Sequence, residues 1–268
     1  MKKRTLTAIT RAVSPRLADC ELTFLARQKI DVAKAIEQHR GYEECLARLG
    51  VRLVRLPAEP DLPDSVFVED TAIVLDELAV ITRPGAMSRQ AETESVADAL
   101  SEFRPLKFIQ PPATIEGGDV MRVDRTLYTG LSARTNCEGL LQLREIVEPY
   151  DYRVETIETA GCLHLKTGCV YLGHQTILAN RNWINVQLLT GFDLIDVPED
   201  EPWAANTLTI GDTVVTPSGF PKTRGLIEEH GFKTLMIDIS ELQKAEAGLT
   251  CLSLIFESDD RTPREEKL

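Results

Sequence analysis

Five polar residues recur along the chain at nearly constant spacing, and their types together are those of a thiol-based catalyst. They are Asp70, Glu116, His164, Asn206 and Cys251, and successive positions differ by 46, 48, 42 and 45 residues. A cysteine thiolate attacks electrophilic carbon, a histidine passes protons to and from the reacting group, and a carboxylate orients that histidine. We therefore expect these residues to meet in one hollow, provided that each occupies the same place in a repeated structural unit.

The cysteine, the histidine and one of the acids each have a simpler explanation when taken singly. Cys251 lies in an apolar segment, where a free cysteine behaves as a small hydrophobic side chain. His164 would be a structural histidine in a strand, and Glu116, followed by two glycines, would lie in a surface turn with close backbone approach. The catalytic interpretation depends on the convergence of all three. The remaining histidines fit a helix face, a turn and a helix end: His39, His174 and His230.

A second group of charged residues suits the binding of a basic amino acid. Asp64, Glu69 and Asp70 bracket an apolar segment that we expect to be a core strand, and carboxylates in that setting suit a cation. Arg89 and Arg134 each follow a serine at the expected start of a helix, and an arginine fork matches a carboxylate in bidentate fashion. Each arginine taken alone also fits a solvated surface. Together these residues would hold both ends of an amino acid with a cationic side chain.

The composition disfavours several classes of protein. The 268 residues carry a formal net charge of -12, whereas nucleic-acid binding needs clustered lysine and arginine. No stretch approaches the roughly 18 apolar residues of a membrane span, and the basic start of the chain is not followed by the apolar segment of a signal peptide. The six cysteines include no CxxC pair, and no metal-site spacing occurs. We expect a cytoplasmic protein with a small-molecule substrate and without metal, cofactor, nucleic-acid or membrane partner.

A weak internal repeat would position these residues. Its pattern is a strand, a turn, a second strand, a helix and a third strand. In the clearest copy, residues 119–123 and 126–129 form the two strands, and Ser132 caps a helix that runs through 138–147. Three further copies have strands at 65–68, 72–75 and 79–82 with a helix at 92–103; strands at 169–172 and 176–179; and strands at 207–210 and 213–216 with a helix at 222–230.

The fifth copy is divided between the two ends of the chain. Residues 250–256 would pair with residues 6–13, and the long helix at 31–49 would follow. Modules of this kind cannot bury their apolar faces alone, so we expect them to close into a ring that strands from both termini lock. An ordinary mixed sheet with helices on its faces is the alternative. We expect one catalytic domain over residues 1–256 and a charged, flexible tail over residues 257–268.

Seven motifs in the same order resemble those of the dimethylarginine dimethylaminohydrolase family. They are LPDSVFVED (62–70), ITRPGAMSR (81–89), TIEGGD (114–119), SARTN (132–136), HLKTG (164–168), AAN (204–206) and LTCLS (249–253). The resemblance covers residues 6–256. It implies the pentein fold of the guanidino-group-modifying superfamily, a five-bladed α/β propeller of ββαβ modules, in agreement with the expected ring. It also implies hydrolysis of Nω-methylated and Nω,Nω-dimethylated L-arginine to citrulline and mono- or dimethylamine.

The resemblance further implies a role for each site residue. Cys251 would be the nucleophile that carries a covalent thiouronium intermediate, His164 the general acid and base, and Glu116 the residue that orients His164. The implied substrate-binding residues are Asp70 and Glu69 for the guanidinium, Asp64 and the backbone near Leu22 for the α-amino group, Arg89 and Arg134 for the α-carboxylate, and Ala245. Leu22 would belong to a mobile lid.

Two positions separate this chain from its relatives. Arginine deiminases, which resemble it in their Cys, His and Glu, carry an Asp two residues after the histidine, where this chain has Lys166. Loss of that carboxylate leaves room for N-methyl groups, which cannot donate hydrogen bonds, so the change favours methylated arginine. The family also usually has Asp-Gly shortly before the cysteine, whereas this chain has Ala245-Glu246-Ala247-Gly248.

Three other activities are compatible with the same fold. A deiminase or related hydrolase would act on arginine or another guanidino acid. An amidinotransferase would pass the covalent intermediate to an amine, although the chain lacks the extended insertions of that class. A non-catalytic propeller, as in the ribosome anti-association factors, has no need for Cys, His and Glu at the ring axis. The sequence neither predicts nor excludes a homodimer.

Overall fold

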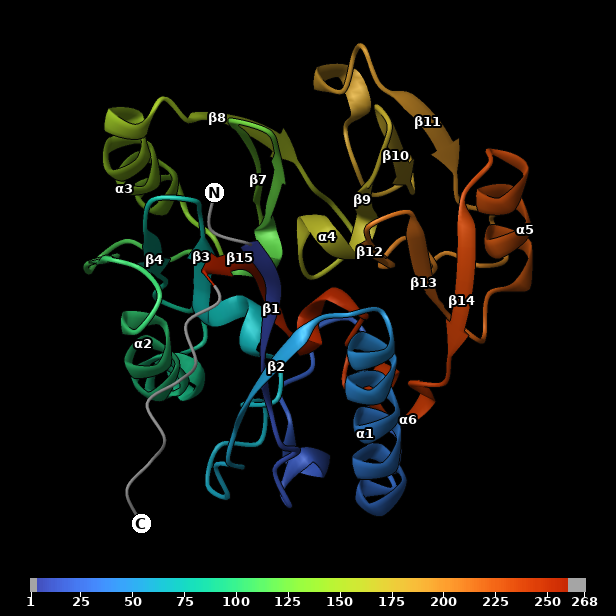
Figure 1. The fold of residues 1–268 in the computed structure, drawn as a ribbon, viewed down its shortest axis with the longest axis horizontal. Coiled ribbons are helices and arrows are strands. Elements are labelled where there is room, and N and C mark those ends of the chain that lie inside the picture. The colour runs from blue at the N-terminus through green and yellow to red at the C-terminus, as the bar shows by residue number, and fades with distance from the viewer. Residues whose placement is uncertain (1–3, 260–268) are drawn as a thin grey trace.

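The computed structural model describes residues 4–259, which fold into five sheets of three strands each. In every sheet an inner strand runs antiparallel to the middle strand, and the middle strand runs parallel to the outer one. Figure 1 shows the sheets arranged around a common centre with the longer helices outside them. The expected ring of repeated modules is therefore confirmed, and the ordinary mixed sheet is not what forms.

Each sheet consists of one inner, one middle and one outer strand. In that order the strands are β15 (Leu254–Asp259), β1 (Arg4–Arg11) and β2 (Arg52–Leu56); β3 (Ala72–Val74), β4 (Ala79–Ile81) and β5 (Leu106–Phe108); β6 (Val120–Val123), β7 (Thr126–Leu131) and β8 (Arg153–Glu158); β9 (Cys169–Gly173), β10 (Thr176–Ala179) and β11 (Asp193–Asp196); β12 (Leu208–Ile210), β13 (Thr213–Pro217) and β14 (Lys233–Ile237). Inner strands of neighbouring sheets lie side by side, as β15 does with β3 and β9 does with β6 and β12.

Four helices connect a middle strand to its outer strand, and they are α1 (Val32–Arg48), α2 (Thr93–Ser101), α3 (Cys137–Val147) and α5 (Pro221–Glu229). The expected helices agree with these, except for one cap. The side chain of Asn136, and not Ser132, accepts the Gly139 N–H at the start of α3. Asn136 caps the helix because it directly precedes the first helical residue, whereas the Ser132 hydroxyl donates a hydrogen bond to Asp119. The β9–β11 module has only a 3-10 turn, η6 (Val186–Leu188), at this place.

Short helical turns precede the inner strands. They are η2 (Val68–Thr71), η4 (Gly117–Asp119), α4 (Leu165–Gly168) and η7 (Thr250–Leu252). The strand expected at 65–68 is therefore wrong, and the strand expected from 250 starts at Leu254. The apolar residues there are buried in tight turns, which periodicity cannot distinguish from a buried strand. The other short elements are η1 (Leu17–Asp19), η3 (Met87–Glu92), η5 (Glu148–Tyr150) and α6 (Ser240–Gln243).

Strands from the two ends of the described chain close the ring. β1 pairs antiparallel with β15 from Arg4↔Asp259 to Ile9↔Leu254, which confirms the divided fifth module. Residues 257–259, expected in the flexible tail, continue β15; residues 260–268 lie outside the described part. Between residues 4 and 259, none of the helices has the length and apolar character that crossing a membrane requires.

The turns around the axis are packed backbone to backbone. A Cβ added at Gly117 would lie 2.0 Å from the carbonyl oxygen of Glu69, so η4 can approach η2 only because this residue is glycine. By contrast, Gly41 in the middle of α1 has open space around the same position.

We predict opposite effects of adding a methyl group at these two glycines. Gly117→Ala should lower the free energy of unfolding by about 3 kcal/mol, because backbone atoms of η2 must move. Gly41→Ala should raise it by up to about 1 kcal/mol, because alanine is the better helix former. Urea denaturation of both variants checks the pair. Equal stability of Gly117→Ala and the parent chain would contradict the close approach of the two turns.

Candidate active site

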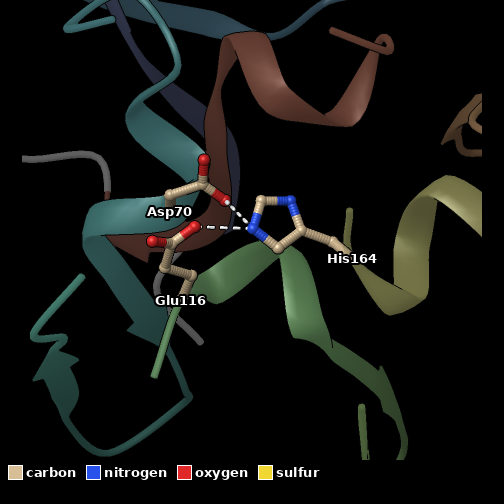
Figure 2. Close-up of side chains that lie close together, drawn as sticks. All are labelled: Asp70, Glu116 and His164. Carbon is tan, nitrogen blue, oxygen red and sulfur yellow. Dashed lines mark hydrogen bonds and ion pairs between the residues drawn. The ribbon is translucent and has the colours of Figure 1, made fainter. Parts of the chain in front are cut away.

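Three turns from three modules bring Asp70, Glu116 and His164 together at the ring axis (Figure 2). The Nε2 atom of His164 lies 2.6 Å from Glu116 Oε2 and 3.8 Å from Asp70 Oδ1. All three side chains are buried. Both carboxylates thus face the same ring nitrogen, and the convergence expected from the repeat spacing is found for these residues.

The surrounding acids keep His164 protonated. Burial acts to lower its pKa, but the charge of Asp70, the hydrogen bond with Glu116 and the charge of Asp119 outweigh burial and raise the pKa to about 9. Burial acts to raise the pKa of Asp70, but the positive charges of His164 and Arg89 outweigh burial and lower it. At neutral pH the imidazole therefore carries a proton that it can donate.

Cys251 borders the same hollow as His164. It lies in η7, just before β15, and its Sγ accepts the Gly248 N–H at 3.3 Å. The hollow has a volume of about 20 Å³ and is bordered by both side chains. Burial raises the pKa of the Cys251 thiol far above its usual range, and the negative charges of Glu69 and Asp70 raise it further. The resting sulfur is therefore a thiol, and a nearby cation is needed to make it a thiolate.

Seven of the predicted site residues border this hollow. They are Asp64, Asp70, Arg89, Arg134, His164, Ala245 and Cys251. Glu116 does not border the hollow; it contacts His164 directly and lies within ion-pair distance of Arg134 and Arg89, at 3.7 and 4.0 Å. Leu22 is half-buried and packs against the apolar cluster that contains Cys251.

The two arginines differ in how many donors they keep free. Arg89 donates from Nε and Nη2 to Glu92 and from Nη1 to Asp70 Oδ2 at 2.7 Å, so most of its fork is already used. Arg134 donates from Nη2 to the Thr23 hydroxyl at 3.3 Å, while its buried Nη1 lies 3.7 Å from Glu116 Oε1 and has no hydrogen-bond partner among the described residues. Arg134 is thus the arginine that keeps a free donor beside the hollow, and the bidentate clamp expected of Arg89 stays a prediction.

Glu69 faces the opposite side of the ring axis. Its Oε1 pairs with Lys166 Nζ at 2.5 Å, and its Oε2 accepts the Thr250 hydroxyl at 2.7 Å. Together with Lys166 it borders a larger cavity of about 570 Å³ and not the hollow of Cys251. Its direct contact with a guanidinium therefore stays a prediction.

Asn206, the remaining member of the five, supports the turn that carries Cys251. Its Oδ1 accepts the Thr250 N–H at 2.9 Å, and its Nδ2 donates to the Thr250 hydroxyl at 3.1 Å. Its side chain also occupies the space that a Cβ on Gly248 would need. The repeat correctly places Asn206 next to Cys251, where it fixes the backbone.

Two important residues were not assigned a role from the sequence. Asp119 is buried and accepts the Leu165 N–H at 2.9 Å as well as the Ser132 and Thr135 hydroxyls at 2.6 Å, which holds the turn that carries His164. Its place in the TIEGGD motif was the available signal. Glu92, which holds Arg89 in a buried ion pair at 2.8 Å, lies in an otherwise ordinary helical segment and offered none.

The cluster of Asp70, Glu116 and His164 also has the composition of a metal site, since one ligand atom from each lies within 4.8 Å of the others. Its charges are already balanced in another way. Arg89 donates to Asp70, and Glu116 shares a proton with His164. A protonated imidazole does not ligate a metal, so the observed contacts describe an ion-pair network.

Comparison with known proteins identifies the family. A family model described as "N,N dimethylarginine dimethylhydrolase, eukaryotic" matches residues 22–252. The N(G),N(G)-dimethylarginine dimethylaminohydrolase of Pseudomonas aeruginosa is 40% identical over 230 residues, which covers 85% of this chain and 91% of that protein. The chain belongs to the dimethylarginine dimethylaminohydrolase family.

One further dimethylarginine dimethylaminohydrolase and a solved structure support this membership. The enzyme of Streptomyces coelicolor is 37% identical over 248 residues, covering 92% of this chain and 95% of its own length. A solved structure of the Pseudomonas aeruginosa protein, a serine-for-cysteine mutant complexed with citrulline, matches with a TM-score of 0.90 and 38% identity over 96% of this chain and all of that one. The pentein fold expected from the resemblance is therefore confirmed.

The raised pKa of His164 predicts how stability depends on pH in this family member. An unfolded histidine has a pKa near 6.5, so protonated His164 stabilises the fold fully below that pH, and this contribution is lost as the pH rises towards 9. The difference in unfolding free energy between the parent chain and His164→Gln should fall by about 3 kcal/mol over that range. Urea titrations at several pH values measure it.

His39 provides a control of opposite sign. Burial lowers the pKa of His39, so its neutral form is favoured in the folded chain and its contribution changes only below about pH 6.5. His39→Gln should therefore shift stability by a constant amount between pH 7 and 9. If the His164→Gln difference is equally flat, His164 is neutral in the folded chain and the charge assignment is wrong.

Proposed function

We propose that this chain hydrolyses Nω,Nω-dimethyl-L-arginine and Nω-monomethyl-L-arginine to L-citrulline and di- or monomethylamine. The observation that carries the proposal is the hollow that Cys251 and His164 share, bordered by Asp64 and Asp70. A thiol with a strongly raised pKa among carboxylates is poised to react only when a cation arrives. A guanidinium is such a cation, and its central carbon is the electrophile that a thiolate attacks. The citrulline complex of the Pseudomonas relative supports the product.

Cys251 and His164 divide the first half of the reaction. The bound guanidinium favours ionisation of Cys251, whose proton leaves to solvent, and the thiolate attacks the guanidinium carbon. His164, protonated at neutral pH, donates its proton to the departing methylated amine. The carbon–nitrogen bond breaks, and a positively charged thiouronium remains on Cys251. Glu116 would hold the imidazole ring in position and stabilise its charge.

The second half of the reaction consumes one water. His164, now neutral, takes a proton from water as the resulting hydroxide attacks the thiouronium carbon. The carbon–sulfur bond breaks and citrulline leaves, with His164 protonated again. No step requires a metal or a redox cofactor, because the polarised guanidinium carbon and the thiolate supply the electrophile and the nucleophile.

The remaining residues would hold the amino-acid end of the substrate. The free donor of Arg134 suits the α-carboxylate, and Arg89 would assist it. Asp64, whose Oδ2 accepts the Glu21 N–H at 3.1 Å, would pair with the α-amino group beside Leu22 and Ala245. Asp70 would face the guanidinium.

The ion pair of Lys166 with Glu69 favours methylated over plain arginine. Lys166 stands where deiminases carry an aspartate and pairs with Glu69 in the other cavity, so no carboxylate from either residue borders the hollow and an N-methyl group there leaves fewer acceptors unpaired. Arginine deimination is the alternative activity on this fold.

We expect Cys251→Ser to bind substrate and to lose turnover by about 10⁴-fold or more, because serine lacks a nucleophile that a nearby cation can ionise. Citrulline release and substrate binding by calorimetry measure the two effects. Cys137→Ser is the matched control, since Cys137 is exposed on α3 and should leave turnover unchanged. Turnover retained by Cys251→Ser would remove Cys251 from the mechanism.

A panel of guanidino compounds tests the substrate. The kcat/KM for dimethyl- and monomethylarginine should exceed that for arginine by about tenfold or more, the discrimination expected when one buried hydrogen bond is unmatched. Citrulline production is the measurement for all three. A preference for arginine would make the chain a deiminase.

A further inference from the structure

The segment over the Cys251 hollow, residues 21–25, is held by an unusual contact that the reaction scheme does not use. We call this segment the lid. The carboxylate of Glu246 accepts three consecutive lid amides, from Thr23 at 3.0 Å and from Phe24 and Leu25 at 2.5 Å each. Successive backbone N–H groups that point at one site form an anion-binding concavity. Here the anion is a side chain of the protein itself.

We propose that Glu246 is a positioning residue for the hydrolysis, whose carboxylate latches the lid over the hollow and must release it for substrate to enter and product to leave. This inference rests on the proposed function for its substrate, and its physical part, the latch, can be tested without turnover.

The size of the hollow requires the lid to move. A volume of about 20 Å³ holds roughly one water molecule, whereas a methylated arginine has more than a dozen non-hydrogen atoms. A second cavity of about 240 Å³, bordered by Leu25, Trp203 and Phe220, lies on the other side of Glu246 and Ala247, which border both spaces. Release of the lid by Glu246 would open the small hollow towards this larger space.

Among the other contacts between lid and core, the Ser88 hydroxyl donates to the Glu21 carboxylate at 2.7 Å, and two more use residues that the substrate would claim. Asp64 accepts the Glu21 N–H, and Arg134 donates to the Thr23 hydroxyl. Both would exchange these contacts for the α-amino and α-carboxylate groups. Glu246 has no such assigned partner in the substrate, so it can hold the lid in both the empty and the occupied enzyme. With three accepted amides against the single hydrogen bond from Ser88, Glu246 makes the larger part of the lid contact that the substrate does not displace.

The backbone at Glu246 is shaped for this contact. Its φ of 61° is in the left-handed region, which a residue with a long side chain seldom adopts without a constraint from its surroundings. Glu246 also lies in the turn that contains Gly248, whose N–H donates to Cys251 Sγ. The latch and the nucleophile thus share one short segment.

Two substitutions test the latch. Glu246→Gln keeps the size of the side chain but loses its charge and one acceptor oxygen, and Glu246→Gly removes the carboxylate while relaxing the left-handed backbone. Both should speed chymotryptic cleavage after Phe24, which is already 42% exposed, and alkylation of Cys251 by iodoacetamide. We expect about a tenfold increase, as for the loss of hydrogen bonds to a charged acceptor. With dimethylarginine, KM should rise more than kcat falls.

Glu241→Gln is the matched control. Glu241 is buried to a similar extent and accepts one backbone N–H, that of Asp31, outside the hollow. It should leave cleavage, alkylation and KM unchanged. If both Glu246 variants are cleaved and alkylated at the parent rate, the latch is refuted. If they open as expected but the parent chain turns over no methylated arginine, the latch stands and the proposed substrate is refuted instead.

Discussion

Burying a protonated imidazole in a protein interior costs on the order of several kcal/mol unless acids surround it, and much of this site is arranged to meet that cost. Glu116 binds the His164 ring directly, Asp70 adds a second negative charge, and Asp119 braces the turn from which the ring projects. Glu116 and Asp119 come from the turn at η4, and Asp70 comes from η2. The propeller is what allows so many acids to reach one imidazole without belonging to one segment of chain.

The same negative field sets the chemistry of the sulfur. Burial raises the pKa of the Cys251 thiol, and nearby carboxylates, which also raise the pKa of His164 by stabilising the imidazolium, raise it further. Without a bound cation, the Cys251 thiol is therefore a poor nucleophile, whereas the protonated His164 beside it is a good proton donor. A bound cation favours the thiolate of Cys251 and leaves His164 protonated. Reactivity is thereby coupled to recognition of a positively charged head group.

The ring axis is divided into two unequal spaces. On one side lies the small hollow of Cys251 beneath the lid, and on the other the larger cavity bordered by Glu69 and Lys166. The ion pair of these two residues borders only the larger cavity, and Thr250 links it to the turn that carries Cys251. Cys251, His164 and Glu246 border only the smaller of these two spaces.

The sequence by itself determined the repeat, the order of the modules and the positions of Asp70, Glu116, His164 and Cys251, because strand alternation and a spacing of 42 to 48 residues are local and periodic signals. It could not determine that the segments before the inner strands are helical turns, since a buried turn and a buried strand have the same apolar composition. Nor could it show that Glu69 turns towards Lys166, that Glu92 occupies the fork of Arg89, or that Glu246 reaches the lid. The paired residues are not separated by the repeat spacing, so no sequence pattern predicts them. Only the packing of the closed ring decides which charges meet.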